Sequence, residues 1–293
     1  MESYQTSYFR LQFQIMSTVT ISAADINKLR QATGAGMMDC RKALTETNGD
    51  FEAAIDWLRK QGQKVAAKRS DREAKEGVVI AQTTADHKTG IVVCVSCETD
   101  FVSKNADFVA FGKSIADAAI ANNVNNLEEL MAVKIGELTV AGLVDEKLAT
   151  IGEKIGVTKF QRVDAPYVAS YIHGAYRIGV LVGLNKEAAD AGKDVAMQIA
   201  ALNPVAVDAS SVPADVIARE KDIVMELMKQ DPKMAGKPEE MLTKIAEGKM
   251  GVFFKEQTLT AQAFVKDSSN SVGDYLKESG DVVVTEFKRV ALG

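Results

Sequence analysis

Two cysteines, Cys94 and Cys97, have the C-x-x-C spacing that serves thiol redox chemistry and zinc binding. A redox pair normally opens a helix, whereas these residues continue a β-branched run at residues 91–95, where positions three apart point to opposite faces. The sequence has neither a second cysteine pair nor an H-x-x-x-H group to complete a tetrahedral zinc site. We expect buried strand cysteines with free thiols; a thiol enzyme using this pair is the rival hypothesis.

Other residue patterns that could support catalysis are incomplete. The glycine, lysine and serine at residues 112–114 are typical of the end of a phosphate-binding loop, but Asp107 stands where its first glycine is required. Residues 34–36 lack the third glycine of a dinucleotide fingerprint. The two histidines, His87 and His173, have no nucleophile motif beside them. The sequence therefore indicates a protein that is not an enzyme and that has no cofactor and no metal site.

The segment Thr99-Asp100-Phe101-Val102 places a carboxylate beside an aromatic ring where a strand pattern gives way to a helical one. Such a junction can present both side chains to a partner. The alternative is that Phe101 anchors the core and that Asp100 caps a helix. Residue types alone favour this alternative.

The elements that position these residues begin with three short helical patterns in residues 22–64. Ser22 and Asp25 have the spacing of a capping arrangement, Gly34 supplies a stop, and the last apolar stripe ends near Gly62. We predict a small three-helix domain.

The segments on either side of this domain are expected to carry little structure of their own. Residues 65–76 are strongly charged and predict a linker or an exposed helix. Residues 1–21 form an N-terminal extension. We interpret the segment before Met16 as a tail that orders on contact or as an upstream start-site artefact, with Met16 as the alternative start. Whether residues 1–15 belong to the native protein is left open.

From Gly77 the pattern changes to strands, then to mostly helical sequence up to Gly156, which predicts an α+β unit. The apolar run at residues 91–95 recurs at residues 178–182, and a Gly-Lys pair follows each run. We therefore predict a duplicated α+β core with antiparallel strands. Chance similarity between alanine- and valine-rich segments is the alternative.

The two core subdomains are expected at residues 77–156 and 157–293. Within the second, Pro213 opens a long helical pattern, and a second one follows a break that contains two prolines and a glycine. We predict an antiparallel helical hairpin at residues 213–250 that protrudes from the core, and a last strand around residues 282–287.

Composition narrows the class of partner. The 293 residues are 46% hydrophobic and 26% charged, as in a soluble protein of two or three domains, and the formal charge of -5 offers no cationic field for nucleic acid. No apolar run approaches the roughly 20 residues that cross a bilayer. Three cysteines, Cys40 among them, fit a reducing cytosol. We expect a cytoplasmic protein with a protein partner and no direct nucleic-acid or membrane partner; a homodimer is left open.

Several segments, in one order, resemble the elongation factor Ts family. They are TGAGMMDCRKAL at residues 33–44, NGD at 48–50, CETDFV at 97–102, HGA at 173–175 and RIGVL at 177–181. The resemblance spans nearly the whole chain, roughly from Ser22 to Phe287. It implies an N-terminal three-helix domain similar to ubiquitin-associated folds, a duplicated α+β core and a protruding antiparallel coiled coil.

The resemblance also implies a partner, elongation factor Tu, bound both with GDP and magnesium and without nucleotide. The implied function is guanine nucleotide exchange in translation. In the family the aspartate and phenylalanine of the T-D-F motif enter the partner's GTPase domain near its magnesium site. That role falls here to Asp100 and Phe101, with Thr99 and Val102 beside them.

Further contacts are implied by the other matching segments. The G-A-G-M-M segment nominates Met37, Met38 and Arg41, although we expect one of the two methionines to pack inside the bundle. The H-G-A segment nominates His173, which is equally consistent with an internal turn residue.

Near the C-terminus, Phe264 and Val265 resemble the family's contact outside the GTPase domain. Lys266 and Asp267 depart from the apolar pattern expected after them.

A second hypothesis for the whole chain is a binding adaptor whose three-helix domain captures a ubiquitin-like surface.

Overall fold

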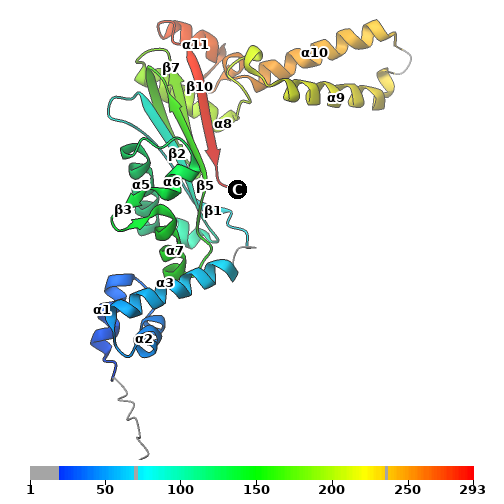
Figure 1. Ribbon diagram of the computed structural model, residues 1–293. Helices are drawn as coiled ribbons and strands as arrows, with labels where there is room; N and C mark the ends of the chain where they lie inside the picture. The colour runs from blue at the N-terminus through cyan, green and yellow to red at the C-terminus, as the bar shows by residue number, and fades with distance from the viewer. Residues whose placement is uncertain (1–19, 69–71, 235–236) are drawn as a thin grey trace, which may run out of the picture. The chain divides into compact units, whose positions relative to one another are not determined.

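The computed structural model describes residues 20–68, 72–234 and 237–293 (Figure 1). These residues form two compact units. The first contains the described residues up to Lys68 together with Asp145–Gly152, and the second contains the rest. Most of the predicted N-terminal extension lies outside the described residues, as do residues 69–71 of the predicted linker and residues 235–236 of the predicted hairpin.

The first unit contains α1 (Ala23–Thr33), α2 (Met37–Glu46) and α3 (Phe51–Lys68). The predicted capping box is present: Ser22 Oγ accepts from the Asp25 N–H at 3.1 Å, and Asp25 Oδ2 accepts from the Ser22 N–H at 3.2 Å. α1 stops at Gly34, which has a φ of +68°. A buried apolar cluster holds the helices together: Leu29, Ala35, Cys40, Ala43, Leu44, Ala54 and Leu58.

The predicted stop near Gly62 is wrong, because α3 continues to Lys68. Gly62 instead permits a close approach to α7 (Val140–Ile151). A Cβ at Gly62 would lie 2.5 Å from the Cβ of Ala149, closer than the Cβ atoms of two packed residues approach. This glycine is a packing residue rather than a helix terminator.

The second unit is built on two three-stranded antiparallel sheets with the same topology. One has the order β1-β2-β5 and the other β6-β7-β10, so that in each the second strand of a hairpin is central and a later strand completes the sheet. A helix follows each hairpin, α5 (Ala106–Ala121) and α8 (Ala189–Leu202). The strands are β1 (Glu76–Thr83), β2 (Thr89–Cys97), β5 (Gly156–Asp164), β6 (Tyr167–His173), β7 (Ile178–Leu184) and β10 (Val284–Ala291). This repetition confirms the predicted duplicated core.

The repeated Gly-Lys pair has a common packing role. A Cβ at Gly112 in α5 would lie 2.8 Å from Val78 Cγ2 in β1, and a Cβ at Gly192 in α8 would lie 2.6 Å from Ala169 Cβ in β6. Each glycine therefore lets its helix pack closely on its own sheet. The recurrence seen in the sequence thus has a physical cause.

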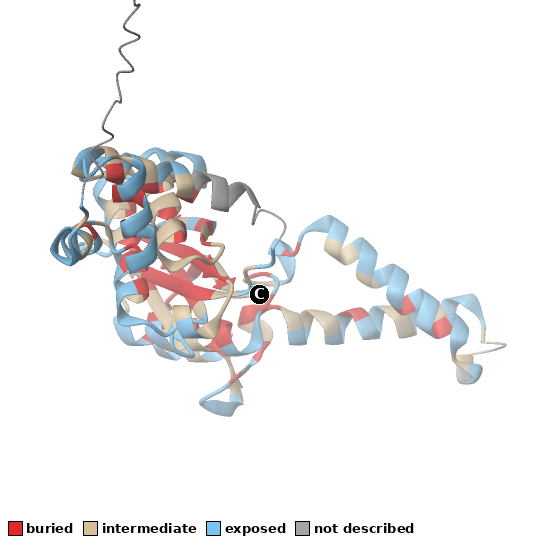
Figure 2. Cartoon of the chain, turned by 90° about the horizontal axis from the view of Figure 1, so that it is seen from below, coloured by how far each residue is buried: buried red, intermediate tan, exposed pale blue. Residues whose placement is uncertain are grey.

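The other faces of the two sheets pack against each other. A Cβ at Gly179 would lie 2.7 Å from Val79 Cγ1 and 2.8 Å from Val92 Cγ2, atoms of the opposite sheet. The residues between the sheets form one apolar cluster: Val79, Ala81, Val92, Cys94, Val163, Val168, Leu181 and Val290. The result is a helix–sheet–sheet–helix arrangement whose strands are largely buried (Figure 2).

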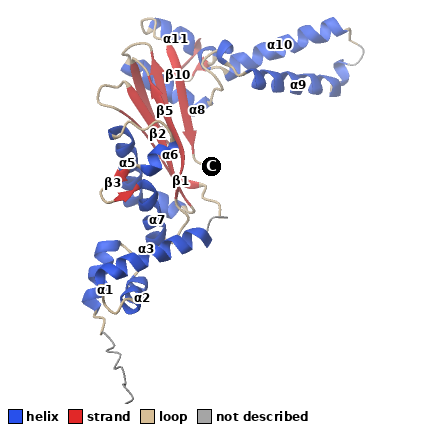
Figure 3. Cartoon of the chain, in the orientation of Figure 1, coloured by secondary structure: helices blue, strands red, loops and turns tan. Residues whose placement is uncertain are grey.

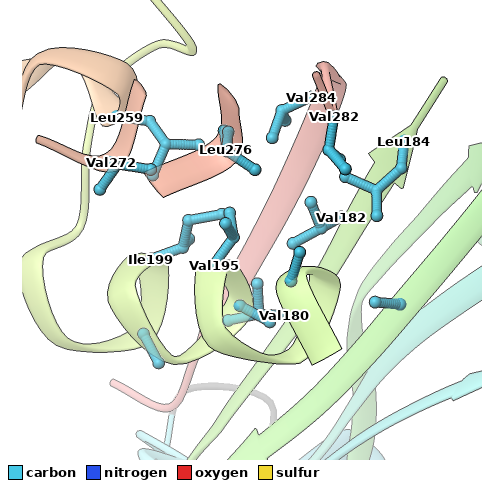
Figure 4. Packing of buried hydrophobic residues seen from close by; sticks show 14 of the residues in the cluster. Val180, Val182, Leu184, Val195, Ile199, Leu259, Val272, Leu276, Val282 and Val284 are labelled. Carbon is cyan, nitrogen blue, oxygen red and sulfur yellow. The ribbon is translucent and has the colours of Figure 1, made fainter. Parts of the chain in front are cut away.

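A second cluster fills the space between α8 and the sheet β6-β7-β10 (Figure 4). Val195 and Ile199 of α8 lie against Val180 and Val182 of β7. The cluster also includes Leu276 of α11 (Val272–Glu278). Burying side chains of this size contributes about 1.5–3 kcal/mol each.

Shorter elements complete the second unit. The stretch before residue 156 holds, besides helices, a two-stranded hairpin that the sequence prediction missed, turning at Gly136 with a φ of +67°. The elements are α4 (Asp100–Ser103), α6 (Leu127–Ala132), β3 (Lys134–Ile135), β4 (Leu138–Thr139), β8 (Ala263–Phe264), β9 (Asp267–Ser271) and the 3-10 turns Ala209–Ser211, Pro232–Met234 and Leu259–Ala261.

An antiparallel helical hairpin extends from the core, as predicted (Figure 3). Its helices are α9 (Ala214–Gln230) and α10 (Glu239–Gln257), so the second helix runs beyond the expected end at residue 250. Pro213 and Pro238 precede the two helices, positions where proline preorganises the chain and loses no hydrogen bond. The buried seam between the helices is small: Val224, Met228 and Met250.

Candidate functional site

Phe101 lies at the junction where β2 ends and α4 begins, and its ring is the most exposed large hydrophobic side chain of the described chain. It is 85% exposed, so the hypothesis that Phe101 anchors the core is wrong. Asp100 is the first residue of α4 rather than its N-cap, a position taken by Thr99. The structure therefore leaves the acid and the ring at the surface.

Asp100 is paired with Lys104, the residue that directly follows α4. Its Oδ2 accepts a hydrogen bond from Lys104 Nζ at 2.6 Å, and this hydrogen bond holds the pKa of the Asp100 carboxyl below its ordinary value. The pair therefore favours the charged form of the carboxyl and directs it toward the residue that follows the helix. Lys104 was missed in the sequence, although its position four residues after Asp100 is the spacing of a helical ion pair.

The backbone at Thr99 is held from a distant part of the chain. Glu153 accepts hydrogen bonds from the Thr99 hydroxyl at 2.7 Å and from the Thr99 N–H at 3.0 Å. The Cys97 thiol donates to the Thr99 carbonyl oxygen at 3.2 Å. Thr99 is thus bound on both its donor and its acceptor groups, and Glu153 is a residue that sequence reasoning did not identify.

Both cysteines of the C-x-x-C motif are buried and free, as predicted. Burial raises the pKa of the Cys94 thiol, and burial together with the nearby Glu153 carboxylate raises the pKa of Cys97 to about 12. A reactive thiol needs a lowered pKa and an accessible sulfur. This geometry gives no support to the thiol-enzyme hypothesis.

An open groove of about 610 Å³ is lined by α4 and by the turn between β6 and β7. Its lining residues are Glu76, Gly77, Glu98, Thr99, Asp100, Phe101, Ser103, Lys104, Val109, Gly174, Ala175, Tyr176 and Arg177. Segments from the two halves of the duplicated core, remote in sequence, therefore meet at one surface.

The β6–β7 turn has an unusual backbone. Gly174, Ala175 and Tyr176 are consecutive left-handed residues, with φ of +63°, +52° and +70°. Left-handed non-glycine residues cost about 1–3 kcal/mol each and persist only where neighbours fix them. Here the Val79 N–H donates to the Tyr176 carbonyl oxygen at 2.8 Å, and Arg177 pairs with Glu76 at 3.1 Å.

His173 precedes this turn and is exposed, outside the groove lining. Its Nδ1 lies 3.1 Å from the Tyr171 hydroxyl, so part of its hydrogen-bonding capacity is used within its own strand. This hydrogen bond fits the alternative of a residue satisfied within its own core, and a contact of the exposed ring with a partner stays a prediction.

In the first unit, Met37 and Met38 open α2 and are 54% and 72% exposed, and Arg41 is exposed on the same helix. The expectation that one methionine packs inside the bundle is wrong. The inward face of α2 is supplied by Cys40 and Leu44, four residues apart and fully buried.

Val265 is half-exposed, at the turn between β8 and β9. The fully buried Gln198 of α8 fixes this turn, since its Oε1 accepts from the Val265 N–H at 2.8 Å. Lys266 stands where the family resemblance led us to expect an apolar residue. Its ammonium group lies 2.5 Å from the Asp194 carboxylate, which neutralises its charge. Val265 is not part of the groove lining.

The described residues contain no group of three or more His, Cys, Asp or Glu side chains placed to hold a metal ion. None of the described helices combines the length and the apolar character needed to span a membrane.

Comparison with known proteins agrees with this architecture. The family described as elongation factor TS matches residues 98–293. The elongation factor Ts of Christiangramia forsetii is 47% identical over 277 residues, which cover 93% of this chain and 99% of that protein. That of Flavobacterium psychrophilum is 47% identical over 278 residues, or 94% of this chain and 99% of the relative.

A more distant relative extends the same agreement. The elongation factor Ts of Methylococcus capsulatus is 44% identical over 281 residues, covering 94% of this chain and 93% of the relative. Identity at this level over nearly the full length leaves one assignment: the chain belongs to the elongation factor Ts family.

Proposed function

We propose that this chain is a guanine nucleotide exchange factor that promotes release of GDP from elongation factor Tu. The observation that carries the proposal is the exposed ring of Phe101 beside the charged Asp100, on a backbone held in place at Thr99. An aromatic side chain left in water gains about 1.5–3 kcal/mol when a partner pocket buries it. The fixed backbone lowers the entropy lost on binding.

Exchange of this kind involves no bond chemistry. The factor binds the nucleotide-free GTPase more tightly than the GDP-bound form, and by reciprocity it weakens GDP binding by the same ratio. A loosening of about 10⁴-fold requires roughly 5.5 kcal/mol of differential affinity. Phe101 supplies only part of this amount, so several contacts act together.

In this mechanism Phe101 acts as a wedge near the phosphate site, and Asp100 acts on the surroundings of the partner's magnesium ion. Magnesium requires near-ideal octahedral oxygen geometry, so a small shift of its ligands costs much of its binding energy. The carboxylate of Asp100 carries its charge into the contact together with the paired Lys104. Loss of the ion then weakens the hold on the GDP phosphates.

The remaining candidate residues divide into contacts and supports. Met37, Met38 and Arg41 offer exposed apolar and charged groups on α2, and His173 and Val265 offer two further contacts. Val102 is half-buried beside Phe101, and Thr99 acts through its hydrogen bonds to Glu153. The excess of 40 acidic over 35 basic residues favours a protein partner over nucleic acid.

The test uses elongation factor Tu loaded with a fluorescent GDP analogue and chased with excess unlabelled GDP. We expect substoichiometric amounts of the chain to accelerate analogue release, and added GDP to weaken capture of the partner in a pull-down. An adaptor would bind without accelerating release and without sensitivity to GDP. Release at the spontaneous rate would therefore contradict the proposed function.

A further inference from the structure

We propose that Glu153 is a positioning residue for Asp100 and Phe101, an inference that rests on the proposed function. Glu153 lies 54 residues after Thr99 in the sequence, just before β5, and does not line the groove. Its carboxylate nevertheless binds the backbone immediately before Asp100. We call the hydrogen-bonded set of Glu98, Thr99, Glu153 and Lys154 the Glu153 clamp.

The clamp is reciprocal. The Glu153 carboxylate accepts from the N–H groups of Glu98 at 3.2 Å and Thr99 at 3.0 Å, and from the Thr99 hydroxyl at 2.7 Å. In return, the Glu98 carboxylate accepts from the Lys154 N–H at 2.6 Å. Each segment thus binds the backbone of the other through a charged side chain, and such bonds are about twice as strong as neutral ones.

The clamp is also joined to the sheet. The Ser96 hydroxyl of β2 donates to the Gly156 carbonyl oxygen of β5 at 3.2 Å, and Ser96 pairs with Gly156 in the strand register. The segment that carries Glu153 is therefore fixed to the same pair of strands from which α4 departs. As a result, the direction in which the chain leaves β2 is set by side-chain hydrogen bonds.

The clamp matters because α4 has little stability of its own. It spans only Asp100–Ser103, which is about one turn, and helices this short do not persist without tertiary contacts. No α4 residue is fully buried, and Val102 and Ser103 are half-buried, so packing orients the helix only in part. The hydrogen bonds at Thr99 are then the main restraint on where Asp100 and Phe101 point, and misplacement by about 1 Å can cost up to 10²-fold in a process that depends on geometry.

Glu153→Gln is a sharp test of this arrangement. The substitution keeps the size of the side chain, but both N–H groups of the clamp meet the same oxygen, Oε2. An amide oxygen in the place of Oε2 can still accept from both N–H groups, but the NH₂ group cannot accept from the Thr99 hydroxyl, which must turn to accept instead, and the negative charge that strengthens all three bonds is lost. Thr99→Val removes only the hydroxyl donor, whereas Thr99→Ser keeps it.

We expect Glu153→Gln to lower the maximal rate of GDP release roughly tenfold, with a half-saturating concentration changed by less than about threefold, since contacts elsewhere keep the affinity. Thr99→Val is expected to lower the rate less than Glu153→Gln does. Thr99→Ser, which keeps the hydroxyl, is expected to release GDP at the rate of the unmodified chain. Adding Glu153→Gln to the Phe101→Ala variant should cost less than it costs in the unmodified chain, because the part of its effect that acts through the ring is already lost.

The matched control is Glu137→Gln, the same chemical change at an exposed position of the β3–β4 turn, which should leave release unchanged. A wild-type rate in Glu153→Gln, or an equal loss in the Phe101→Ala background, would overturn the positioning role while the proposed function stands. If the unmodified chain itself fails to accelerate release, the proposed function is what fails. Circular dichroism on each variant, with Thr99→Val as the milder change, separates misplacement from unfolding.

Discussion

The Asp100 carboxylate and the Lys104 ammonium lie 2.6 Å apart across α4, beside the exposed ring of Phe101. Both side chains are largely in solvent, so the pair adds little to global stability. Its effect is local: it lowers the pKa of the Asp100 carboxyl and limits the directions that the carboxylate can take. In the proposed function, this ion pair and the neighbouring ring belong to one contact surface.

Lys104→Met should free the Asp100 carboxylate. Because the pKa of Asp100 is lowered by Lys104, it should rise toward its ordinary value in the variant. A lowered pKa stabilises the folded form above the ordinary pKa, and this contribution is lost as pH falls through the lowered value. NMR titration of the Asp100 carboxyl measures the change, and GDP release should slow severalfold.

The control for this change is Lys244→Met, which breaks a pair with the same spacing, Glu240–Lys244 at 3.0 Å, on the exposed surface of α10. It should leave the Asp100 titration unchanged. An unaltered Asp100 pKa in Lys104→Met would show that the ion pair does not persist in solution.

Two glycine substitutions should have opposite effects on stability. A Cβ at Gly179 would lie 2.7 Å from Val79 Cγ1, so Gly179→Ala overpacks the space between the sheets and should lower the free energy of unfolding by about 1–3 kcal/mol. Gly251 lies within α10 with nothing within 4 Å of the added atom, so Gly251→Ala should raise helix stability by about 0.4–1 kcal/mol. Denaturant unfolding measures both, and a stabilised Gly179→Ala would contradict the packing of the two sheets.

Cys97 should be inert in the folded protein. Its pKa is raised to about 12 by burial and by Glu153, whereas its ordinary value is 9.0. The thiol of the unfolded chain ionises at a lower pH than the buried thiol of the folded chain. The free energy of unfolding therefore keeps its full value with respect to Cys97 below pH 9 and falls as pH rises toward 12. Iodoacetamide at neutral pH should modify the native thiol far more slowly than the denatured one, as peptide mass spectrometry can show. Equal rates would contradict the burial of Cys97.

The fold was predictable wherever its causes are local. The Ser22–Asp25 capping box and the proline at residue 213 act within one helical turn, and the structure contains both as predicted. Gly62 was misassigned because its cause is not local: the Ala149 side chain that requires a glycine there lies far along the chain. The β3–β4 hairpin, with two residues in each strand, is too short to produce a recognisable pattern.

The candidate site shows the same division. The family resemblance directed attention to Asp100 and Phe101, whereas residue types alone favoured a buried ring, because phenylalanine is more often buried than exposed. Only the folded chain shows that Phe101 is exposed and that Glu153 holds the preceding residue. Lys104 could have been found from its spacing, but no sequence pattern connects Thr99 to a carboxylate 54 positions away.

The most direct measurement of the central claim is the rate of GDP release from elongation factor Tu with Phe101→Ala, with Phe101→Leu as the variant that keeps an apolar side chain. Because the ring is 85% exposed, the free energy of unfolding should change by less than about 0.5 kcal/mol. The account predicts that Phe101→Ala lowers the rate of GDP release at saturation at least tenfold. Phe101→Leu should lower this rate less. Release at the wild-type rate by a correctly folded Phe101→Ala chain would contradict it.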